Sequence, residues 1–259
     1  MTTRVLVPLL FLLAFALPCY PADESALVAA GDAHFVQIDY PAAIRDYDAA
    51  LADTPQSPAL LWRLARAYVC SGEVDKDAPR RIAGMKKAED YARKCIALEP
   101  GQGEGHVWLA AALGYLALDA GVTEQVPLSR ELLDETQRAL EINPRDDAAL
   151  SIRGSFFRAL GNVGWLKRQL AAVFLGAVPE GGYKEAEAAL QAAMAIAPDV
   201  MRHPYELGIL YLDMDRKSEA CRLFERAVQL PIRVAIDVPR LVKIRAYLAG
   251  LNCAGEGAR

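Results

Sequence analysis

Apolar positions recur at helical spacing along most of the chain, and prolines interrupt the pattern at intervals. In the first clear segment Ala43, Tyr47 and Ala50 share one helical face, Pro55 follows them, and a second apolar helix is expected from Leu61. Because proline lacks a backbone N–H and cannot continue a helix, it marks where the preceding helix ends. The same order recurs around Pro100, Pro144, Pro198 and Pro231.

Two antiparallel helices per unit, with a proline closing the second, are typical of tetratricopeptide repeats, whose standard length is about 34 residues. Only the interval from Pro198 to Pro231 has that length, and the three earlier intervals are roughly ten to twenty residues longer. The amphipathic stretch Val238–Leu251 is expected to cap the open end. The sequence therefore predicts an all-α, tetratricopeptide-like right-handed helical solenoid of about five irregular repeats plus a C-terminal cap helix. It spans residues 23–251 and leaves a frayed tail at 252–259.

The extra residues fall between the first and second helices of repeats 2, 3 and 4, at one edge of the array. Insertions that cluster on one face often mark a binding face. The first, Glu73–Gly84, is charged and is expected to be a solvated loop, whereas the second ends in Pro127–Ser129, a suitable cap for a helix from Arg130. The third predicts an extra amphipathic helix, or an extension of the helix before it, from its apolar residues Trp165, Leu166, Leu170 and Phe174.

The first residues follow a different pattern. Arg4 precedes an uncharged apolar run from Val5 to Leu17, which ends at Pro18. A basic start, about a dozen apolar residues and a helix-breaking end are typical of an export signal, here residues 1–22. We therefore expect a periplasmic or extracellular protein. The alternative, an uncleaved membrane anchor, needs roughly 20 apolar residues, which the run does not reach. A lipid-modified Cys19 is a further alternative.

Four parts of the chain are more specific than a generic repeat. They are residues 60–67 (LLWRLARA), residues 139–146 (ALEINPRD), the set Gly154, Trp165, Arg168, Phe174, Pro179 and Tyr183–Ala186, and Leu207-Gly208 followed by Tyr211. In their order and spacing they resemble the regulator of microtubule dynamics family of tetratricopeptide-like proteins. The resemblance implies an α-helical interaction module, which in animal cells is associated with microtubules, spindle poles and organelle surfaces. Because the start resembles an export signal, we expect microtubules as partners only if the host is eukaryotic.

The groove of such an array is lined by faces of the first helices that do not pack on the second. The candidate groove residues are Trp62, Arg63, Arg66, Leu109, Leu113 and Arg158. Arg63 and Arg66 lie about one turn apart, so both guanidinium groups could pair with a carboxylate or phosphate of a partner. Alternatively, they pair with neighbouring acids such as Glu89 or Asp90.

Leu109 and Leu113 belong to a run of leucines in the first helix of repeat 3 that continues to Leu116. An apolar groove wall would favour an apolar occupant, which could be an amphipathic helix, a lipid chain or the protein's own third insertion. A solvent-accessible cavity at these leucines would favour ligand binding, and a groove filled by the insertion would exclude it.

Four cysteines lie within the repeats. If the protein is exported, disulfides can persist. Cys221 begins the second helix of the last repeat, and Cys253 ends the cap helix. Antiparallel packing of those two helices would bring this pair together. The alternative is that Cys70, Cys95, Cys221 and Cys253 are all buried thiols that behave as small apolar groups.

No motif for catalysis, for a cofactor or for a metal accompanies the repeats. His34, His106 and His203 lie in separate repeats, without an HExxH motif or a Cys/His cluster. The formal net charge of −4 gives no general attraction to nucleic acid, whose binders are usually basic. We therefore expect a non-catalytic scaffold or adaptor, with no cofactor, that binds a protein or peptide. The alternative is a protein that binds an apolar ligand or phospholipid at a membrane surface in the cell envelope.

Overall fold

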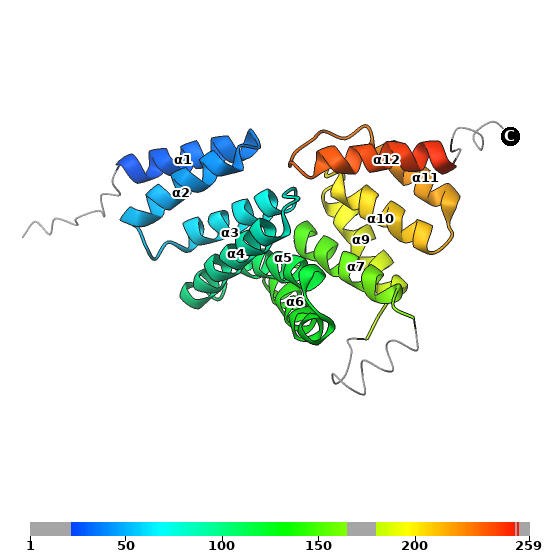
Figure 1. Ribbon diagram of the computed structural model, residues 1–259, viewed down its shortest axis with the longest axis horizontal. Helices are drawn as coiled ribbons and strands as arrows, with labels where there is room; N and C mark the ends of the chain where they lie inside the picture. The colour runs from blue at the N-terminus through cyan, green and yellow to red at the C-terminus, as the bar shows by residue number, and fades with distance from the viewer. Residues whose placement is uncertain (1–21, 165–179, 252, 254–259) are drawn as a thin grey trace, which may run out of the picture.

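The computed structural model describes residues 22–164, 180–251 and 253, and within these ranges it contains helices and no strand. Consecutive helices form antiparallel pairs, and the pairs stack into a curved array (Figure 1). The predicted all-α, tetratricopeptide-like solenoid with a cap helix is confirmed. The pairs are α1 (Ala22–Val36) with α2 (Tyr40–Asp53), α3 (Pro58–Gly72) with α4 (Ala78–Leu98), α5 (Gly103–Asp119) with α6 (Val122–Ile142), α7 (Asp147–Gly161) with α9 (Tyr183–Ile196), and α10 (Arg202–Asp213) with α11 (Lys217–Ala227), followed by α12 (Asp237–Leu251).

Local sequence signals set where many of these helices begin and end. Asp39, Asp77 and Asp146 accept hydrogen bonds from the backbone N–H three residues further on, at 3.0, 2.9 and 2.8 Å. These bonds satisfy donors that have no partner within the first turn of a helix. A closing proline lies two residues after the end of α4 at Pro100 and of α6 at Pro144. The prolines therefore mark the ends of second helices, as predicted.

Small side chains allow the paired helices to approach closely. Ala43, Ala92 and Ala139 are fully buried between helices. A Cβ atom added to Gly208 would lie only 2.5 Å from the Phe224 ring, so no larger residue fits there without displacing the ring. The alanine and glycine pattern that predicted the repeats therefore reflects close helix packing.

The first two insertions are helical, which corrects two predictions. Asp77 caps α4 at Ala78, so most of Glu73–Gly84 forms the first turns of a long helix and not a solvated loop. α6 begins at Val122 and contains Pro127, so Pro127–Ser129 does not cap it. Proline has a φ angle that suits a helix and removes one hydrogen bond, and α6 continues through it. Both insertions therefore lengthen a second helix, to 21 residues in each case.

Two predictions fall on residues outside the described ranges. One is the helix of the third insertion with Trp165, Leu166, Leu170 and Phe174. The other is the export signal at residues 1–22, of which only the last residue is described. Among the helices of the described ranges, none is both long enough and apolar enough to cross a bilayer.

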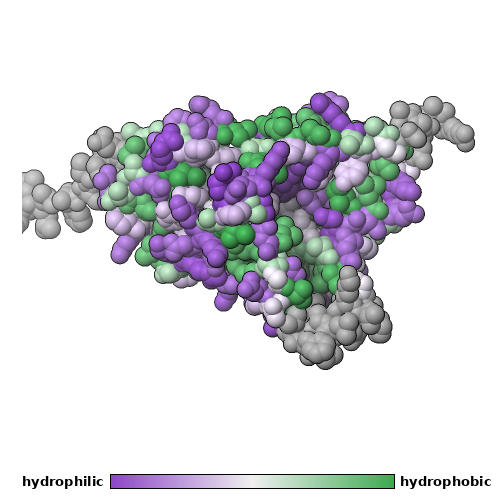
Figure 2. All heavy atoms as spheres, in the orientation of Figure 1, coloured by the Kyte–Doolittle hydropathy of each residue, from purple (hydrophilic) through white to green (hydrophobic). Residues whose placement is uncertain are grey.

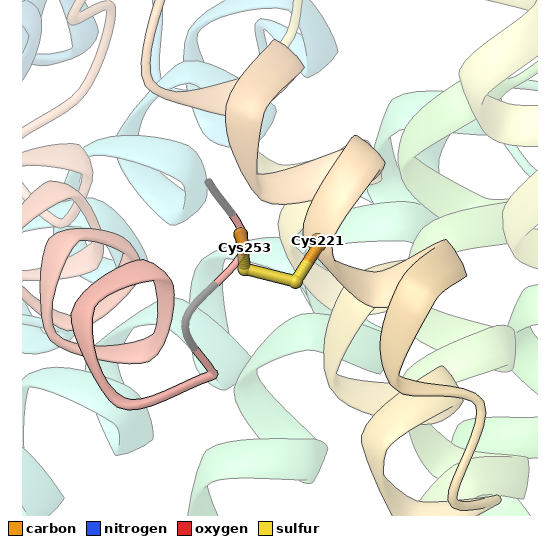
Figure 3. The surroundings of a disulfide bond; sticks show 2 residues. All are labelled: Cys221 and Cys253. Atoms are coloured by element: carbon orange, nitrogen blue, oxygen red, sulfur yellow. A yellow bond between two sulfur atoms is a disulfide. The ribbon is translucent and has the colours of Figure 1, made fainter. Parts of the chain in front are cut away.

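The cap helix α12 packs on α11 and is covalently joined to it. Cys221 near the start of α11 forms a disulfide with Cys253 beyond the end of α12, with their Cα atoms 5.7 Å apart (Figure 3). The predicted pairing is confirmed. The alternative of four buried thiols holds only for Cys70 and Cys95, which are buried and free.

The segment between α11 and α12, residues 228–236 and here called the strap, reaches back to the first repeat. Its residues Val234 and Ala235 pack against the first-repeat core that contains Phe35 and Tyr40, and the Ala235 N–H donates to the Tyr40 hydroxyl at 3.0 Å. Figure 1 shows the two ends of the array meeting at the top of the view, with the strap running toward α1 and α2. The cap therefore closes the array onto its own beginning.

Candidate functional site

The predicted groove arginines lie on α3 and pair with the first repeat. Arg63 Nε donates to Asp32 Oδ1 at 3.1 Å, and Arg66 Nη2 forms an ion pair with the same oxygen at 3.8 Å. Tyr47 donates its hydroxyl to this oxygen at 2.6 Å. These four residues are called the first-repeat cluster. Both arginines thus have an internal partner, as the alternative prediction proposed.

The partner itself was predicted wrongly. Glu89 pairs with Arg93 at 2.8 Å and Asp90 pairs with Lys94 at 2.7 Å, all on α4. The reason is geometric, because the exposed face of α3 lies beside α1 of the preceding repeat and not beside α4.

Asp32 carries a charge that this environment stabilises. Burial alone would raise the pKa of Asp32, but hydrogen bonds from Tyr47 and Arg63 and the charges of Arg63 and Arg66 lower it below the ordinary value of 3.8. Burial and the bond to Asp32 raise the pKa of the Tyr47 hydroxyl, which stays protonated as the donor. The cluster is therefore a stable ionic group at neutral pH.

Arg66 is the member of the cluster with unused binding capacity. Its guanidinium lies 3.8 Å from the centre of the Phe35 ring and 5.0 Å from that of Trp62. Its Nε is buried without a hydrogen-bond partner, while the side chain as a whole is 23% exposed. Trp62 also stacks on Arg63 at 4.5 Å. The partly exposed guanidinium, beside two aromatic rings, suits an incoming carboxylate, which would approach its other nitrogens and not the buried Nε.

A second ionic cluster lies deeper on the concave surface. Glu73, which follows α3, accepts from the Tyr115 hydroxyl at 2.7 Å and from Arg202 at 3.5 Å. The Glu73 side chain is 3% exposed, and its Oε2 has no partner. Burial, followed by the charge of Glu73, raises the pKa of Tyr115 well above its ordinary value. Repeats 2, 3 and 5 are thus linked through one buried carboxylate.

Arg158 belongs to a third cluster, at the other end of the array. Its Nη1 donates to Asp213 at 2.9 Å, and its Nη2 lies 3.7 Å from Glu206. Its Nε is also buried without a partner. Arg158 therefore joins α7 to α10, and it lies in a cluster separate from Arg63 and Arg66.

The predicted apolar groove wall does not exist at the leucines named for it. Leu109 and Leu113 are fully buried in the core between α3, α4 and α6, because they face the neighbouring helices and not the groove. An accessible apolar hollow of about 470 Å³ lies instead at the edge where the first two insertions sit. This insertion-edge groove lies between α4, α5 and α6, and its apolar residues include Ile82, Leu116, Pro127 and Leu128.

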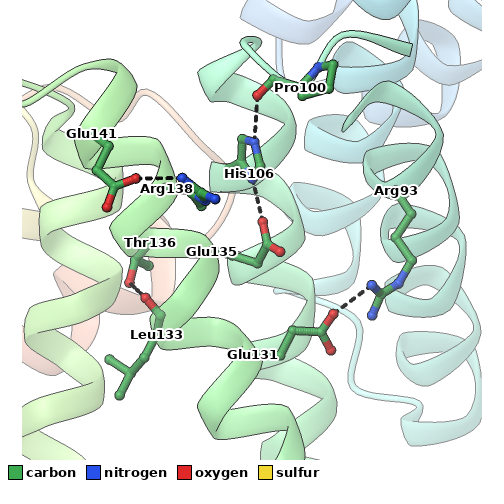
Figure 4. Close-up of polar contacts among 9 residues, drawn as sticks. All are labelled: Arg93, Pro100, His106, Glu131, Leu133, Glu135, Thr136, Arg138 and Glu141. Atoms are coloured by element: carbon green, nitrogen blue, oxygen red, sulfur yellow. Dashed lines mark hydrogen bonds and ion pairs between the residues drawn. The ribbon is translucent and has the colours of Figure 1, made fainter. Parts of the chain in front are cut away.

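Several charges around the insertion-edge groove are paired with one another. Arg81 and Asp119 form an ion pair at 2.6 Å, and Arg93 joins Glu89 to Glu131, the latter also at 2.6 Å (Figure 4). These pairs bind the extended second helices to their neighbours, and Lys86 and Glu124 line the groove as well.

His106, one of the three isolated histidines, has a structural role. Its Nδ1 lies 2.5 Å from Glu135 and its Nε2 lies 3.0 Å from the Pro100 carbonyl, so that it connects α5, α6 and the preceding turn (Figure 4). Within the described ranges, no three His, Cys, Asp or Glu side chains are grouped so that they could hold a metal ion.

Sequence reasoning missed Asp32, Tyr47, Glu73, Tyr115 and Arg202. Tyr47 and Tyr115 lie on the apolar faces that predicted the repeats, whereas Glu73 and Arg202 lie at helix ends, where no local pattern selects them. Their grouping depends on how separate repeats stack, since Glu73 and Arg202 are 129 positions apart.

Comparison with known proteins gives one consistent result. The family described as Regulator of microtubule dynamics protein 1-3 matches residues 32–250. Regulator of microtubule dynamics protein 1 of Caenorhabditis elegans is 24% identical over 190 residues, which cover 73% of this chain and 83% of the relative. For protein 1 of Mus musculus the identity is 23%, over 74% of this chain and 64% of the relative. For protein 2 of Bos taurus the match spans only 42% of the relative.

A solved structure supports the fold. A tetratricopeptide protein of Thermus thermophilus superimposes with a TM-score of 0.66 at 22% identity, over 87% of this chain and 99% of the other. At this level of identity the likeness extends to the fold alone.

Proposed function

The chain belongs to the regulator of microtubule dynamics family, and from this premise we propose that it is a non-catalytic adaptor that binds a protein or peptide through the concave surface of its first two repeats. Arg66 carries the proposal, because its guanidinium is partly exposed beside the Phe35 and Trp62 rings. The partner segment would present a carboxylate beside an apolar or aromatic side chain. Microtubules are proposed as a destination only where the host has them.

A phospholipid or another apolar ligand is the weaker proposal. The surface that would have supported it, a wall formed by Leu109 and Leu113, is buried. The first-repeat cluster presents charged and aromatic groups, which suit a peptide better than an acyl chain.

The test is a quantitative capture experiment with three forms of the protein. Wild type, Arg66→Gln and Arg145→Gln are compared as baits in extract from the native host. Arg145 is exposed in the turn before α7, so its variant is a control for the loss of one positive charge. We expect specific partners to be recovered equally by wild type and Arg145→Gln, and about tenfold less by Arg66→Gln, because a charge-assisted hydrogen bond is worth about 1.5–3 kcal/mol.

Circular dichroism and thermal unfolding establish that each bait is folded. If folded Arg66→Gln captures the same proteins in the same amounts as wild type, the adaptor does not use this surface.

We also propose export, with the mature chain starting between about Cys19 and Ser25. The Cys221–Cys253 disulfide supports this proposal, because disulfides persist in oxidising compartments. N-terminal sequencing of protein purified from its host tests it, and a chain that starts at Met1 or Thr2 would contradict it.

A further inference from the structure

The strap lies against the same first-repeat residues that form the proposed binding surface. Val234 and Ala235 pack on the first-repeat core, which contains Phe35 and Tyr40, and Phe35 is the ring beneath the Arg66 guanidinium. The Tyr40 side chain is almost fully buried, and its hydroxyl accepts the Ala235 N–H. The strap therefore covers part of the surface that a partner of Arg66 would approach.

The strap is held in shape by the beginning of α12. Asp237, itself buried, accepts the backbone N–H groups of Arg233 at 3.0 Å and Val234 at 3.2 Å. Its other carboxylate oxygen pairs with Arg240 at 3.0 Å. Because these bonds lie within the strap and α12, the two can move together as one unit without breaking them.

This unit packs on the last repeat, at the end of the array. Ile244 is fully buried, and Tyr247 stacks on Phe224 of α11 with ring centres 5.2 Å apart. On its outer side the unit exposes Ile232, Val238 and Val242, and apolar residues gather along the upper edge of the face in Figure 2, over the strap. Small peripheral units with few buried contacts open locally more readily than a core. Beyond this apolar packing, the unit is attached by the Ala235–Tyr40 hydrogen bond, the Arg233–Asp199 ion pair and the disulfide.

We propose that the strap is an internal occupant of the concave surface beside Arg66, and that the Cys221–Cys253 disulfide determines how often it leaves. This rests on the proposed function, because a partner of Arg66 would compete with the strap. The disulfide closes a segment with a sequence separation of 32, which contains the whole strap and α12. A cross-link of this kind restricts the conformations of the open state, so its loss raises the open population by roughly a hundredfold.

The redox step is an ordinary thiol–disulfide exchange with a dithiol reductant. A thiolate of the reductant attacks one sulfur of the pair, and its second thiol then displaces the remaining one. Cys221 and Cys253 gain two electrons and two protons in total, and the reductant becomes a disulfide. The cap remains part of the chain but is no longer cross-linked to α11.

The internal occupant also indicates the shape of a competing partner. The strap is not helical and places small aliphatic side chains on the first-repeat core that contains Phe35 and Tyr40. A partner that replaces it would be a non-helical segment with small aliphatic residues, a backbone N–H for the Tyr40 hydroxyl and a carboxylate for Arg66.

The chain contains a reporter for strap opening and a matched control. Cys70 belongs to the first-repeat core on which the strap packs, and the charges of Arg202 on α10 and Arg240 on α12 act on its thiol. Cys95 lies away from the strap, where its Sγ donates to the Pro58 carbonyl at 3.4 Å. Burial raises the pKa of Cys70 to about 12 and that of Cys95 to about 11, so both thiols react slowly while they are covered.

The experiment measures alkylation of both thiols in the full chain by peptide mass mapping. The forms compared are the oxidised wild type, the same protein after treatment with a dithiol, and a Cys221→Ser/Cys253→Ser variant. We expect Cys70 to react roughly a hundredfold faster in the second and third forms, with no change at Cys95. Tyr40→Phe, with the disulfide intact, should accelerate Cys70 severalfold, because the Ala235 N–H loses its acceptor.

A synthetic peptide with the sequence of residues 231–239 tests occupancy directly. Added to the Cys221→Ser/Cys253→Ser variant, it should slow alkylation of Cys70 and leave Cys95 unaffected. Equal acceleration at Cys70 and Cys95 would mean that the whole protein loosens, and no acceleration would mean that the disulfide does not control the strap. Either result overturns the proposal. Because no partner is involved, these outcomes are independent of the capture experiment with Arg66→Gln.

Discussion

The concave surface and the insertion-edge groove differ in how far their charged side chains are buried and how completely these are hydrogen-bonded. On the concave surface Glu73 is 3% exposed, and Glu73, Arg66 and Arg158 each retain a buried polar atom without a partner. At the groove, Arg93 and Glu131 are 44% and 35% exposed and pair with each other. The insertion-edge groove has an apolar floor and paired charges at its rim. The concave surface has buried charged groups whose hydrogen bonding is incomplete.

This difference indicates which surface is the better candidate for recognition. Incompletely bonded buried groups cost stability, and they are closed to a partner unless the repeats move. The partly exposed Arg66, beside two aromatic rings, is the more specific feature for recognition.

The largest expected effect comes from removing the buried carboxylate. Glu73→Ala leaves Arg202 and the Tyr115 hydroxyl without their partner and should cost about 3–5 kcal/mol in the free energy of unfolding. The matched change at the groove, Glu131→Ala, should cost less than about 1 kcal/mol, because that pair is exposed. Urea unfolding of both variants measures the contrast. Equal losses would show that the two surfaces do not differ in this way.

A smaller contrast separates the buried leucines from the groove. Leu113→Ala removes a fully buried side chain and should cost about 3–4 kcal/mol, whereas Leu116→Ala, at the groove floor, should cost about 2 kcal/mol because water can reach the space. Urea unfolding again provides the measurement. A Leu113→Ala loss below about 1 kcal/mol would return this residue to the groove wall predicted from the sequence.

The smallest effect concerns acid. The pKa of Asp32 is lowered in the folded protein, so its contribution to stability is present above about pH 4 and is lost as pH falls through the folded pKa. Because Asp32 is 40% exposed, the contribution should be below about 1 kcal/mol. Unfolding of wild type and Asp32→Asn at pH 7 and pH 3 should therefore show a smaller acid loss in the variant.

Asp119 is the matched control for this titration. Its pKa is also lowered, first by the hydrogen bond from Arg81, and its side chain is 21% exposed. Asp119→Asn should therefore also reduce the acid loss of stability, and the sizes of the two reductions compare the two surfaces. If both variants flatten it equally, the charges of the two surfaces contribute alike.

Much of the fold could be predicted because its signals are local. A proline two residues after each of α2, α4, α6 and α9, and alanines at the helix contacts, reveal helix pairs without any knowledge of the stacking. The Cys221–Cys253 pair could be proposed because Cys221 lies in the first half of α11 and Cys253 just beyond the end of the adjacent antiparallel helix. The predictions for the first two insertions were wrong because charged residues and Pro127 occur in loops as well as in the early turns of a helix.

The site could be predicted only in part, for a related reason. Helical spacing placed Arg63 and Arg66 on one face correctly, but it could not show that Asp32, on a different repeat, would lie opposite them. Leu109 and Leu113 were assigned to the groove because the first helix of a repeat has several apolar faces. The sequence does not show which of these faces the neighbouring helices cover. Contacts between repeats depend on the curvature of the array, which no local pattern records.

The bond between Tyr40 and Ala235 spans 195 positions of sequence. In an open repeat array every contact is short in sequence, so folding can begin in any repeat and spread, and the ends fray first. Here the first and last units stabilise each other, and closing so long a loop carries an entropic cost before it brings any contact. We therefore expect a folding reaction in which the repeats form early and the ends join late. Once joined, the terminal repeats should exchange their amide hydrogens nearly as slowly as the central ones.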